Sequence, residues 1–447
     1  MWKERIEKYG QALAYMEKIQ NRGIVLGLDG MRRLTKALGN PQDALTFVHI
    51  AGTNGKGSVL EFVFRILKCA GYRTGRYSSP AVFSRQEQIQ VNGRAISRAD
   101  YVRGLETIRQ AAESLEDAGY PYPTPFEVET ALAFWYFRER QCEIVVLECG
   151  MGGLTDATNI IDTTAVCVLT CISMDHKGML GESLEEIAAQ KAGIIKKGCH
   201  VVSACQTPAV MAVMEACCRN QGAALIRADV SSARKIRYGL EKQSFDYGRY
   251  GRLVISMAGR FQIENAVVAV ETIEALKACG YPVTEAMLRR GLLTASWPGR
   301  FAILAKNPLF VADGAHNEDA AEKLKESVSF YFTNKKIITI MGVLRDKEYE
   351  KIAALTAPLA AQVITITPPG TKRALPAWEL AGVVRKYNPH VTAADSLQEA
   401  VEMSYLLADR DSVILAFGSL SYLGELSGIV AERHKIRRDA HGRSEKN

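Results

Sequence analysis

Three features that often define a protein class are absent from this sequence. None of its ten cysteines forms a CxxC pair, no apolar run is long enough to cross a membrane, and the charged N-terminus lacks the apolar core of a signal peptide. We therefore expect reduced, buried thiols in a cytoplasmic protein with no membrane partner. A dense stripe of lysine and arginine with interleaved aromatic residues is also lacking, so we expect no nucleic-acid partner.

The composition is that of a large globular protein with a mild positive charge. The 447 residues are enough for two or three domains, and the hydrophobic fraction of 47% allows a large core. The charged fraction of 23% argues against wholesale disorder. A net charge of +7 suits an enzyme for small anionic ligands such as phosphates and carboxylates.

Strand-like and helical patterns alternate along most of the chain. Residues 142–148, 164–170 and 199–204 predict buried strands, because they are apolar on both faces. Long helical patterns lie between strands of this kind, which predicts an α/β fold with a doubly wound, mostly parallel sheet of the phosphate-loop type. Short alternating strands at 234–257 predict a small antiparallel patch at the edge of this first domain.

A Pro-Gly step marks the predicted domain boundary. We predict a first domain at 1–295, a linker at 296–300 and a second domain at 301–447. Strands and helices alternate again in the second domain, which predicts a smaller Rossmann-like α/β domain. Both domains present polar residues after strands, and this suggests a ligand cleft where the two domains meet.

A glycine-rich segment at 49–58 lies between a predicted strand (46–51) and a predicted helix (59–70). Its glycines let backbone N–H groups approach phosphate oxygens, and the helix N-terminus adds the positive end of a dipole. Lys56 can reach the terminal phosphates, and Ser58 can bind Mg²⁺. A tight connection without a ligand is the alternative. We predict nucleotide binding by Gly52, Thr53, Asn54, Gly55, Lys56, Gly57 and Ser58.

Polar side chains also follow two of the buried strands. Glu148 ends one strand and precedes three glycines, where open α/β sheets bind ligands, and beside a nucleotide it is a natural ligand for a hard cation. Asp175 and His176 follow the next strand and should emerge at the same sheet edge. Asp175 can orient His176, which can complete a metal site, although an Asp-His pair is often purely structural.

Two further positions have competing interpretations. Lys191 lies among small and apolar residues of a predicted helix, where burial would lower its pKa and free the amine for chemistry. The residue pattern alone favours a lysine whose amine reaches solvent. Residues 313–317 follow a predicted strand and form either a ligand-facing element or an ordinary turn with a helix cap. Arg300, on the linker, is placed to reach phosphate from the junction.

Together these motifs resemble the folylpolyglutamate synthase and dihydrofolate synthase family of the Mur ligase superfamily. The resemblance runs nearly end to end, and the phosphate loop combined with the Asp-Gly-Ala-His-Asn element is specific to this family. The matching segments are residues 27–29, 38–41, 51–58, 77–80, 125–127, 148–159, 174–176, 190–196, 262 with 265–266, 297–300, 313–317 and 418–420.

The resemblance implies an ATP-dependent amide ligase. Folylpolyglutamate synthase adds L-glutamate to the γ-carboxylate of a reduced folate through an acyl phosphate, and we expect a monomer. Lys56 and the loop amides would hold the ATP phosphates. Gln262 and Asn265 would lie near the adenine, and Arg300 and Asp313 would contact the nucleotide.

The resemblance also implies metal-binding and catalytic residues. Ser58, Glu148 and His176 would bind Mg²⁺, and Lys191 matches the lysine that these enzymes carbamylate to support a second ion. His316 would lie near the γ-phosphate or the incoming glutamate. The catalytic candidates are therefore Lys56, Lys191 and His316, and the substrate-binding candidates are Ser79, Pro80 and Asp156.

Four positions depart from the family pattern. Ala81-Val82 replace His-Leu, and Leu154 replaces an arginine, which affects the pterin and glutamate contacts. Phe261 replaces a histidine, and Gln190 replaces a glutamate. None of these changes removes a phosphate or metal ligand.

Several alternative functions remain open. The first is a dihydrofolate synthase, or one enzyme that performs both reactions. A murein-precursor ligase is disfavoured, because the chain before Gly52 is too short for the usual N-terminal sugar-binding domain. A catalytically silent nucleotide-binding regulator is a rival from another class, motivated by the four departures. A GTPase switch lacks its guanine-reading Asn-Lys-x-Asp element.

Overall fold

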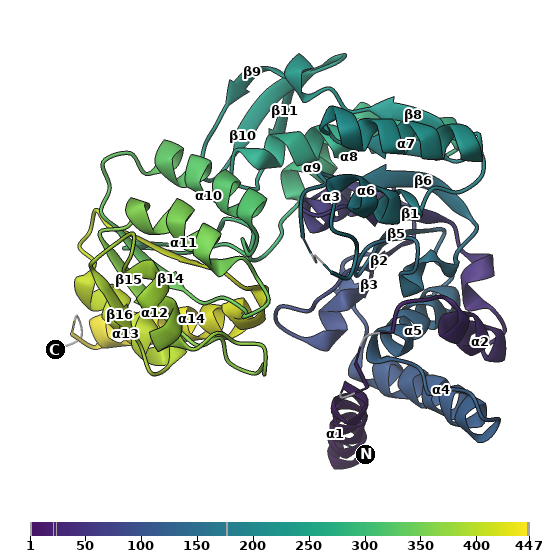
Figure 1. Ribbon diagram of the computed structural model, residues 1–447, viewed down its shortest axis with the longest axis horizontal. Helices are drawn as coiled ribbons and strands as arrows, with labels where there is room; N and C mark the ends of the chain where they lie inside the picture. The colour runs from purple at the N-terminus through teal and green to yellow at the C-terminus, as the bar shows by residue number, and fades with distance from the viewer. Residues whose placement is uncertain (1, 21, 24, 176–177, 445–447) are drawn as a thin grey trace. The chain divides into compact units, whose positions relative to one another are not determined.

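The computed structural model describes residues 2–20, 22–23, 25–175 and 178–444. The chain divides into two compact units, and each contains one large sheet (Figure 1). The first unit comprises Met1–Lys235, Phe245–Ile255 and Ile263–Ala295, and the second comprises Ile236–Ser244, Ser256–Gln262 and Ser296–Asn447.

In the described part of the chain, nine α-helices precede the second large sheet, and η denotes a 3-10 helix. In chain order, the described elements are α1 (Trp2–Gln20), α2 (Asp29–Ala37), η1 (Pro41–Ala44), β1 (Phe47–Ala51), α3 (Lys56–Cys69), β2 (Thr74–Tyr77), η2 (Arg85–Gln88), β3 (Ile89–Val91), β4 (Arg94–Ala95), α4 (Arg98–Asp117), α5 (Pro125–Glu139), β5 (Ile144–Glu148), η3 (Ala157–Ile160), β6 (Thr164–Leu169), α6 (Leu184–Ala192), β7 (His200–Ser203), α7 (Pro208–Gln221), β8 (Ala224–Arg227), η4 (Val230–Ser232), β9 (Arg234–Arg237), β10 (Gln243–Tyr247), β11 (Tyr250–Ile255), α8 (Phe261–Ala278) and α9 (Glu285–Thr294). The elements that follow are β12 (Ala302–Lys306), β13 (Leu309–Ala312), α10 (Glu318–Tyr331), β14 (Ile337–Met341), α11 (Tyr349–Thr356), η5 (Ala357–Leu359), β15 (Gln362–Thr365), α12 (Ala377–Val384), β16 (Val391–Ala393), α13 (Leu397–Leu407), β17 (Val413–Phe417), η6 (Leu420–Tyr422) and α14 (Leu423–Ser444).

β1 occupies the middle of the first sheet, whose strand order is β4-β3-β2-β5-β1-β6-β7-β8. All five of its residues are buried, as expected for a parallel strand that is covered on both faces. β1 pairs in parallel with β5 and β6, so Ile50 lies opposite Glu148 on one side and Val168 on the other. The carboxyl ends of these three strands therefore meet at one sheet edge, where α/β proteins bind ligands.

Helices pack on this sheet in separate groups (Figure 1). α3 packs on β1, β2 and β5 and also against α9. α6 and α7 pack against each other, and their apolar residues share a buried cluster with residues of β6 and β7. α1, α2, α4 and α5 form another group, which shares a core with Phe47 of β1 and Val145 of β5. The strands that carry the ligand-binding edge are thus held by helices along their length.

α9 crosses α3 at a very short distance. A Cβ added at Gly291 would lie 2.4 Å from the Ile66 Cα. We expect Gly291→Ala to lower the free energy of unfolding by about 2 kcal/mol, because the two helices must move apart. Gly10→Ala is the matched control, since its Cβ would meet nothing within 4 Å, and we expect a gain of up to about 1 kcal/mol from helix propensity. Urea denaturation measures both values, and equal stability of the two variants would contradict the close crossing.

The second sheet has the strand order β12-β13-β17-β14-β15-β16. β13, β17, β14, β15 and β16 pair in parallel, and β12 is antiparallel to β13. Its core includes Phe301, Val311, Phe332, Met341 and Phe417, all of which are buried. The residues after β13 therefore begin at the carboxyl edge of a parallel sheet.

The predicted α/β class and the doubly wound, mostly parallel first sheet are confirmed. β12 was not predicted, because it follows the Pro-Gly step directly. The small sheet β11-β10-β9 was predicted at the edge of the first domain, but its strands are divided between the two units. The domain bounds 1–295, 296–300 and 301–447 stay a prediction.

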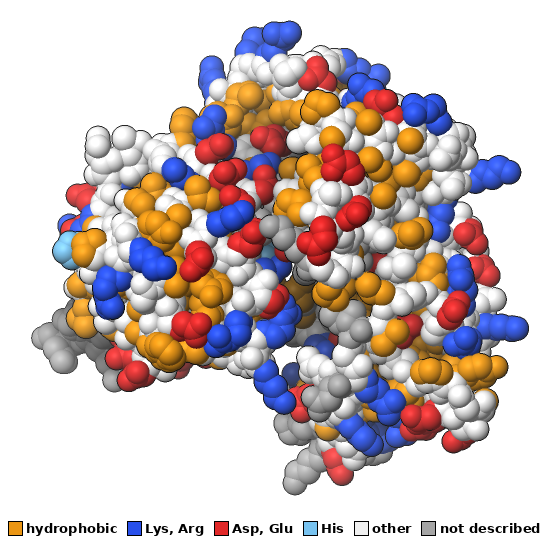
Figure 2. All heavy atoms as spheres, viewed as in Figure 1, with side chains coloured by type: hydrophobic (Ala, Val, Ile, Leu, Met, Phe, Trp, Pro, Cys, Tyr) orange, Lys and Arg blue, Asp and Glu red, His pale blue; other side chains and the backbone are white. Residues whose placement is uncertain are grey.

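The surface carries charges of both signs. On the face shown in Figure 2, Lys and Arg side chains are interspersed with Asp and Glu side chains and with apolar ones. None of the described helices is long and apolar enough to cross a membrane.

Candidate active site

The glycine-rich turn connects β1 to α3 at the sheet edge described above. Gly52 has a φ of 151°, and a Cβ there would lie 1.9 Å from the Thr170 Oγ1, so this position requires glycine. Gly55 has a φ of 91° and is the N-cap of α3, which begins at Lys56. The turn therefore lies at a helix N-terminus, where backbone N–H groups and the helix dipole favour an anion.

Hydrogen bonds join this turn to the segment that follows β6. The backbone N–H groups of Thr53 and Asn54 both donate to the Cys171 carbonyl, at 2.8 and 3.2 Å. The Thr53 hydroxyl donates to the Ser173 carbonyl at 2.9 Å and accepts from the Ser173 N–H at 3.1 Å. Because 171–173 lead directly to Asp175, these bonds bring that carboxylate to the turn.

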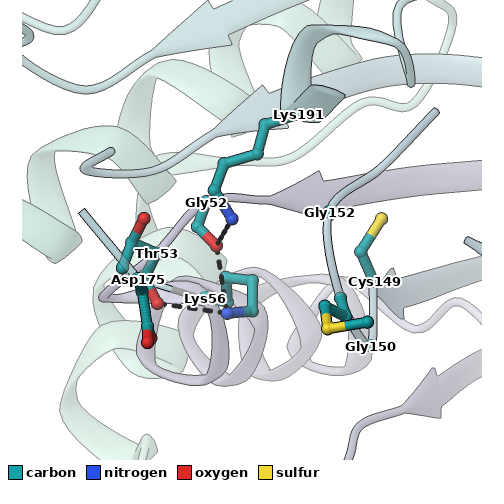
Figure 3. Close-up of a pocket in the computed structure, with 9 residues that line it drawn as sticks. Gly52, Thr53, Lys56, Cys149, Gly150, Gly152, Asp175 and Lys191 are labelled. Atoms are coloured by element: carbon teal, nitrogen blue, oxygen red, sulfur yellow. Dashed lines mark hydrogen bonds between the residues drawn. The ribbon is translucent and has the colours of Figure 1, made fainter. Parts of the chain in front are cut away.

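Two lysine amines donate hydrogen bonds to the same carbonyl of the turn (Figure 3). The Lys56 Nζ donates to the carbonyls of Gly52 and Thr53 at 3.1 and 3.2 Å, and the Lys191 Nζ donates to the Gly52 carbonyl at 2.9 Å. Lys191 is only 4% exposed, so the interpretation that its residue pattern alone favoured, an amine that reaches solvent, is wrong. Burial, followed by the neighbouring Lys56 charge, lowers the pKa of the Lys191 amine to about 7.

A small hollow opens beside the turn. Ser58 and Glu148 are both buried, and each is close in sequence to a residue that lines the hollow. Neither of them lines the hollow itself. His176, the third predicted metal ligand, lies outside the described residues. The hollow is lined by Gly52, Thr53, Lys56, Cys149, Gly150, Met151, Gly152, Asp175 and Lys191 (Figure 3).

Asp156 shapes the loop that follows β5. It is 4% exposed, and its carboxylate accepts hydrogen bonds from the Met151 N–H at 2.8 Å, the Thr158 N–H at 3.0 Å and the Thr158 hydroxyl at 2.5 Å. Burial raises the pKa of this carboxyl, and the hydrogen bonds oppose the shift. The carboxylate predicted to bind substrate is therefore engaged within its own loop.

The remaining predicted site residues of this region lie in α8 and in the segment after β2. Asn265 lies against the turn, since a Cβ added at Gly55 would be 2.5 Å from the Asn265 Oδ1. Gln262 is fully buried at the start of α8. Ser79 and Pro80 follow β2, two strands away from β1, and are not among the residues that line the hollow.

The predicted residues of the second unit form their own cluster after β13. The buried Asp313 carboxylate accepts hydrogen bonds from the N–H groups of Phe301 and Ala315, both at 2.8 Å. Burial raises the pKa of this carboxyl, and the Arg300 charge opposes the shift. The His316 Nδ1–H donates to the backbone carbonyl two residues earlier at 2.7 Å, which fixes the ring and its tautomer.

Sequence reasoning missed a buried polar contact beneath the hollow. His49, in the middle of β1, lies 2.9 Å from the Thr158 Oγ1 and 3.0 Å from the Cys149 Sγ, measured from its Nε2. The signal was present, because a histidine inside an otherwise apolar buried strand needs a hydrogen-bond partner. Nothing in the local pattern indicated that the partner lies 109 residues away.

The residue types at this site fit a triphosphate with magnesium. Glycines at 52 and 55 let the turn pack closely on Thr170 and Asn265, because a Cβ there would lie 1.9 and 2.5 Å from their side-chain oxygens. Ser58, Glu148 and Asp175 offer the oxygen donors that a hard cation prefers. Among the described residues, no three His, Cys, Asp or Glu side chains form a ready-made metal cluster.

Comparisons with known proteins agree with this arrangement. The Mur ligase middle domain matches residues 50–273, and the Mur ligase, glutamate ligase domain matches residues 299–420. Folylpolyglutamate synthase of Lacticaseibacillus casei is 36% identical over 397 residues, which cover 87% of this chain and 90% of that protein. The chain belongs to the folylpolyglutamate synthase and dihydrofolate synthase family.

Other members of this family are also similar. A Bacillus subtilis protein named dihydrofolate synthase/folylpolyglutamate synthase is 34% identical over 351 residues, covering 77% of this chain and 81% of that protein. The structure of Mycobacterium tuberculosis folylpolyglutamate synthase complexed with ADP has a TM-score of 0.89 and 30% identity, covering 95% of this chain and 99% of that one. This chain is therefore an ATP-dependent ligase with small-molecule substrates, and the predicted family and fold class are confirmed.

Proposed function

We propose that this ligase adds L-glutamate to the γ-carboxylate of a reduced folate. The observation that carries the proposal is the convergence of the Lys56 and Lys191 amines on the Gly52 carbonyl, beside a helix N-terminus and a polar hollow. This arrangement supports a triphosphate site, and the acceptor is inferred from the activities in the names of the relatives.

The proposed reaction has two steps. The folate γ-carboxylate attacks the γ-phosphorus of ATP, so that an acyl phosphate forms and ADP leaves. The amine of glutamate then attacks the acyl carbon, the C–N bond forms and phosphate departs. The protein contributes mainly by aligning the reactants and neutralising charge.

The roles predicted for the turn and its neighbours are retained in the proposal. Lys56 and the backbone N–H groups of 52–58 hold the ATP phosphates. Asn265 and Gln262 bind on the adenine side, and Arg300 and Asp313 contact the nucleotide. His316 is proposed to act on the γ-phosphate or on the incoming glutamate.

We propose that the site binds two magnesium ions together with ATP. Ser58, Glu148 and His176 would hold one ion, and a carbamylated Lys191 would support the other. The buried amine with a pKa of about 7 supports this, because a carbamate forms from a neutral amine and CO₂. Bound Mg²⁺ supplies charge neutralisation on the phosphates.

On the acceptor side, we retain Ser79 and Pro80 as substrate-binding residues. Asp156 is retained with them, and it also shapes the 149–158 loop, because its oxygens accept three hydrogen bonds within that loop. We further propose a cytoplasmic monomer without a nucleic-acid partner, with the domain bounds predicted above.

A comparison of acceptors tests the function. Purified protein with ATP, Mg²⁺ and L-glutamate is expected to release ADP with tetrahydrofolate and to lengthen its glutamyl chain, as measured by coupled ADP assay and mass spectrometry. Release with dihydropteroate as well would support the bifunctional alternative, which the name of the B. subtilis relative favours. Absence of ADP release with every reduced folate would refute the substrate assignment.

A further inference from the structure

A line of buried hydrogen bonds runs beneath the hollow, from the middle of β1 to the loop after β5. It begins at His49, which is completely buried, and passes to Thr158, which is also completely buried. It continues from the Thr158 hydroxyl to Asp156 at 2.5 Å, and from Asp156 to the Met151 N–H at 2.8 Å. Met151 belongs to the loop wall of the hollow.

The direction of each bond follows from the donors and acceptors available. The Thr158 hydroxyl has one hydrogen, and the Asp156 carboxylate 2.5 Å away takes it. Thr158 must therefore accept from His49, so the His49 hydrogen is on Nε2. Burial lowers the pKa of His49 to about 3, which keeps the imidazole neutral and this tautomer in place at ordinary pH.

The same Nε2 lies 3.0 Å from the Cys149 Sγ, and Cys149 lines the hollow together with residues 150–152. Within the described structure, the buried His49 Nδ1 has no hydrogen-bond partner. The polar contacts of the ring are thus made through Nε2 alone, to Thr158 and Cys149. Both partners belong to the loop that forms one wall of the hollow.

The opposite wall begins three residues after His49, at Gly52. β1 is therefore connected to the turn by its backbone and to the 149–152 wall by the His49 side chain. Asp156 completes the connection, since it binds both Thr158 and the N–H of Met151.

We propose that His49 and Thr158 are positioning residues for the phosphate end of ATP, and that they do so by setting the 149–152 wall against the glycine-rich turn. The inference rests on the proposed function only in placing the phosphates at this turn. Neither residue lines the hollow, so both act through the wall. At metal sites, loss of such indirect contacts typically lowers metal affinity or activity about 10- to 100-fold, and we expect an effect of similar size here.

Paired substitutions test the connection in the full-length protein. Thr158→Val removes the hydroxyl and keeps the shape, whereas Thr158→Ser keeps the hydroxyl. His49→Leu removes the donor, whereas His49→Gln keeps an N–H near the Nε2 position. Thr272→Val is the matched control, because Thr272 is also completely buried and its hydroxyl donates to the Val268 carbonyl within α8.

The readouts are the affinity for ADP with Mg²⁺ by calorimetry, the KM values of ATP and acceptor, and the melting temperature. Thr158→Val and His49→Leu are expected to weaken ADP binding and raise the KM of ATP about tenfold, with an unchanged acceptor KM. Thr158→Ser and His49→Gln should restore most of the affinity, and Thr272→Val should leave it unchanged. The double variant should lose no more affinity than either single one, because both act through the same bonds.

Two results would overturn the inference. One is a lower melting temperature with unchanged ADP affinity in both removal variants. The other is a loss of ADP affinity in Thr158→Ser and His49→Gln that equals the loss in the removal variants. If Thr158→Val does not fold, the comparison of His49→Gln with His49→Leu still decides the matter. Normal ADP affinity in the wild type without folate-dependent ligation would instead refute the proposed function and leave this inference intact.

Discussion

Lys56→Gln is expected to lower kcat/KM for ATP about a thousandfold, because a cation that neutralises the transferring phosphate is removed. The Lys56 amine donates hydrogen bonds to two carbonyls of its own turn, those of Gly52 and Thr53. Glutamine also carries an N–H donor for these carbonyls, so the turn is expected to stay folded. Steady-state kinetics with varied ATP measure the loss of catalysis, and a melting curve shows whether the variant is still folded.

Lys68→Gln is the control for this prediction. Lys68 lies in the last turn of the same helix, α3, and does not line the hollow. Its replacement removes the same charge from the same helix, and we expect unchanged kinetics. An equal loss of kcat/KM in the two variants would mean that the overall charge of the helix decides the rate, and would contradict a specific role of Lys56.

Lys191→Met is expected to abolish ligation and, at the same time, to stabilise the protein. The folded-state pKa of about 7 lies below the ordinary lysine value of 10.5. Between these values the unfolded chain binds a proton that the folded chain does not, so wild-type stability rises with pH. At pH 7 the buried amine costs roughly 4 kcal/mol, and loss of its bond to the Gly52 carbonyl offsets about 1 kcal/mol of the gain in the variant.

Chemical denaturation at several pH values checks this prediction. The advantage of Lys191→Met should be largest below pH 7 and should shrink to roughly 1 kcal/mol or less near pH 10. Buffers without bicarbonate and magnesium are needed, since a carbamate changes the charge of the group. Lys196→Met is the control, because its amine donates to the Asn159 carbonyl and does not line the hollow. It should retain ligation, and a loss equal to that of Lys191→Met would contradict the assignment.

Local motifs were enough to predict the glycine-rich turn and the strand ends around it. Gly52, Gly55 and Lys56 are close in sequence, and the strands beside them are apolar on both faces, so short-range patterns contain this information. The helix was nevertheless predicted to begin at 59, whereas α3 begins at Lys56. The reason is that Gly55 completes the turn by itself, and Gly57 is tolerated inside the first helical turn.

Contacts between distant segments could not be predicted in this way. Thr53 and Ser173 are 120 residues apart, and His49 and Thr158 are 109 residues apart. Both pairs depend on the order of strands in the sheet, which places β1 between β5 and β6. Burial of Lys191 has the same origin, since its amine meets a carbonyl that is 139 residues earlier in the chain.

The division of β9 to β11 between the two units has a consequence for any attempt to take the protein apart. The chain passes from one unit to the other after residues 235, 244, 255, 262 and 295. A fragment that begins at 301 would lose Gln243, whose amide oxygen accepts from the Tyr331 hydroxyl, and Ala258, which packs with Phe301. No single proteolytic cut can therefore release either unit intact.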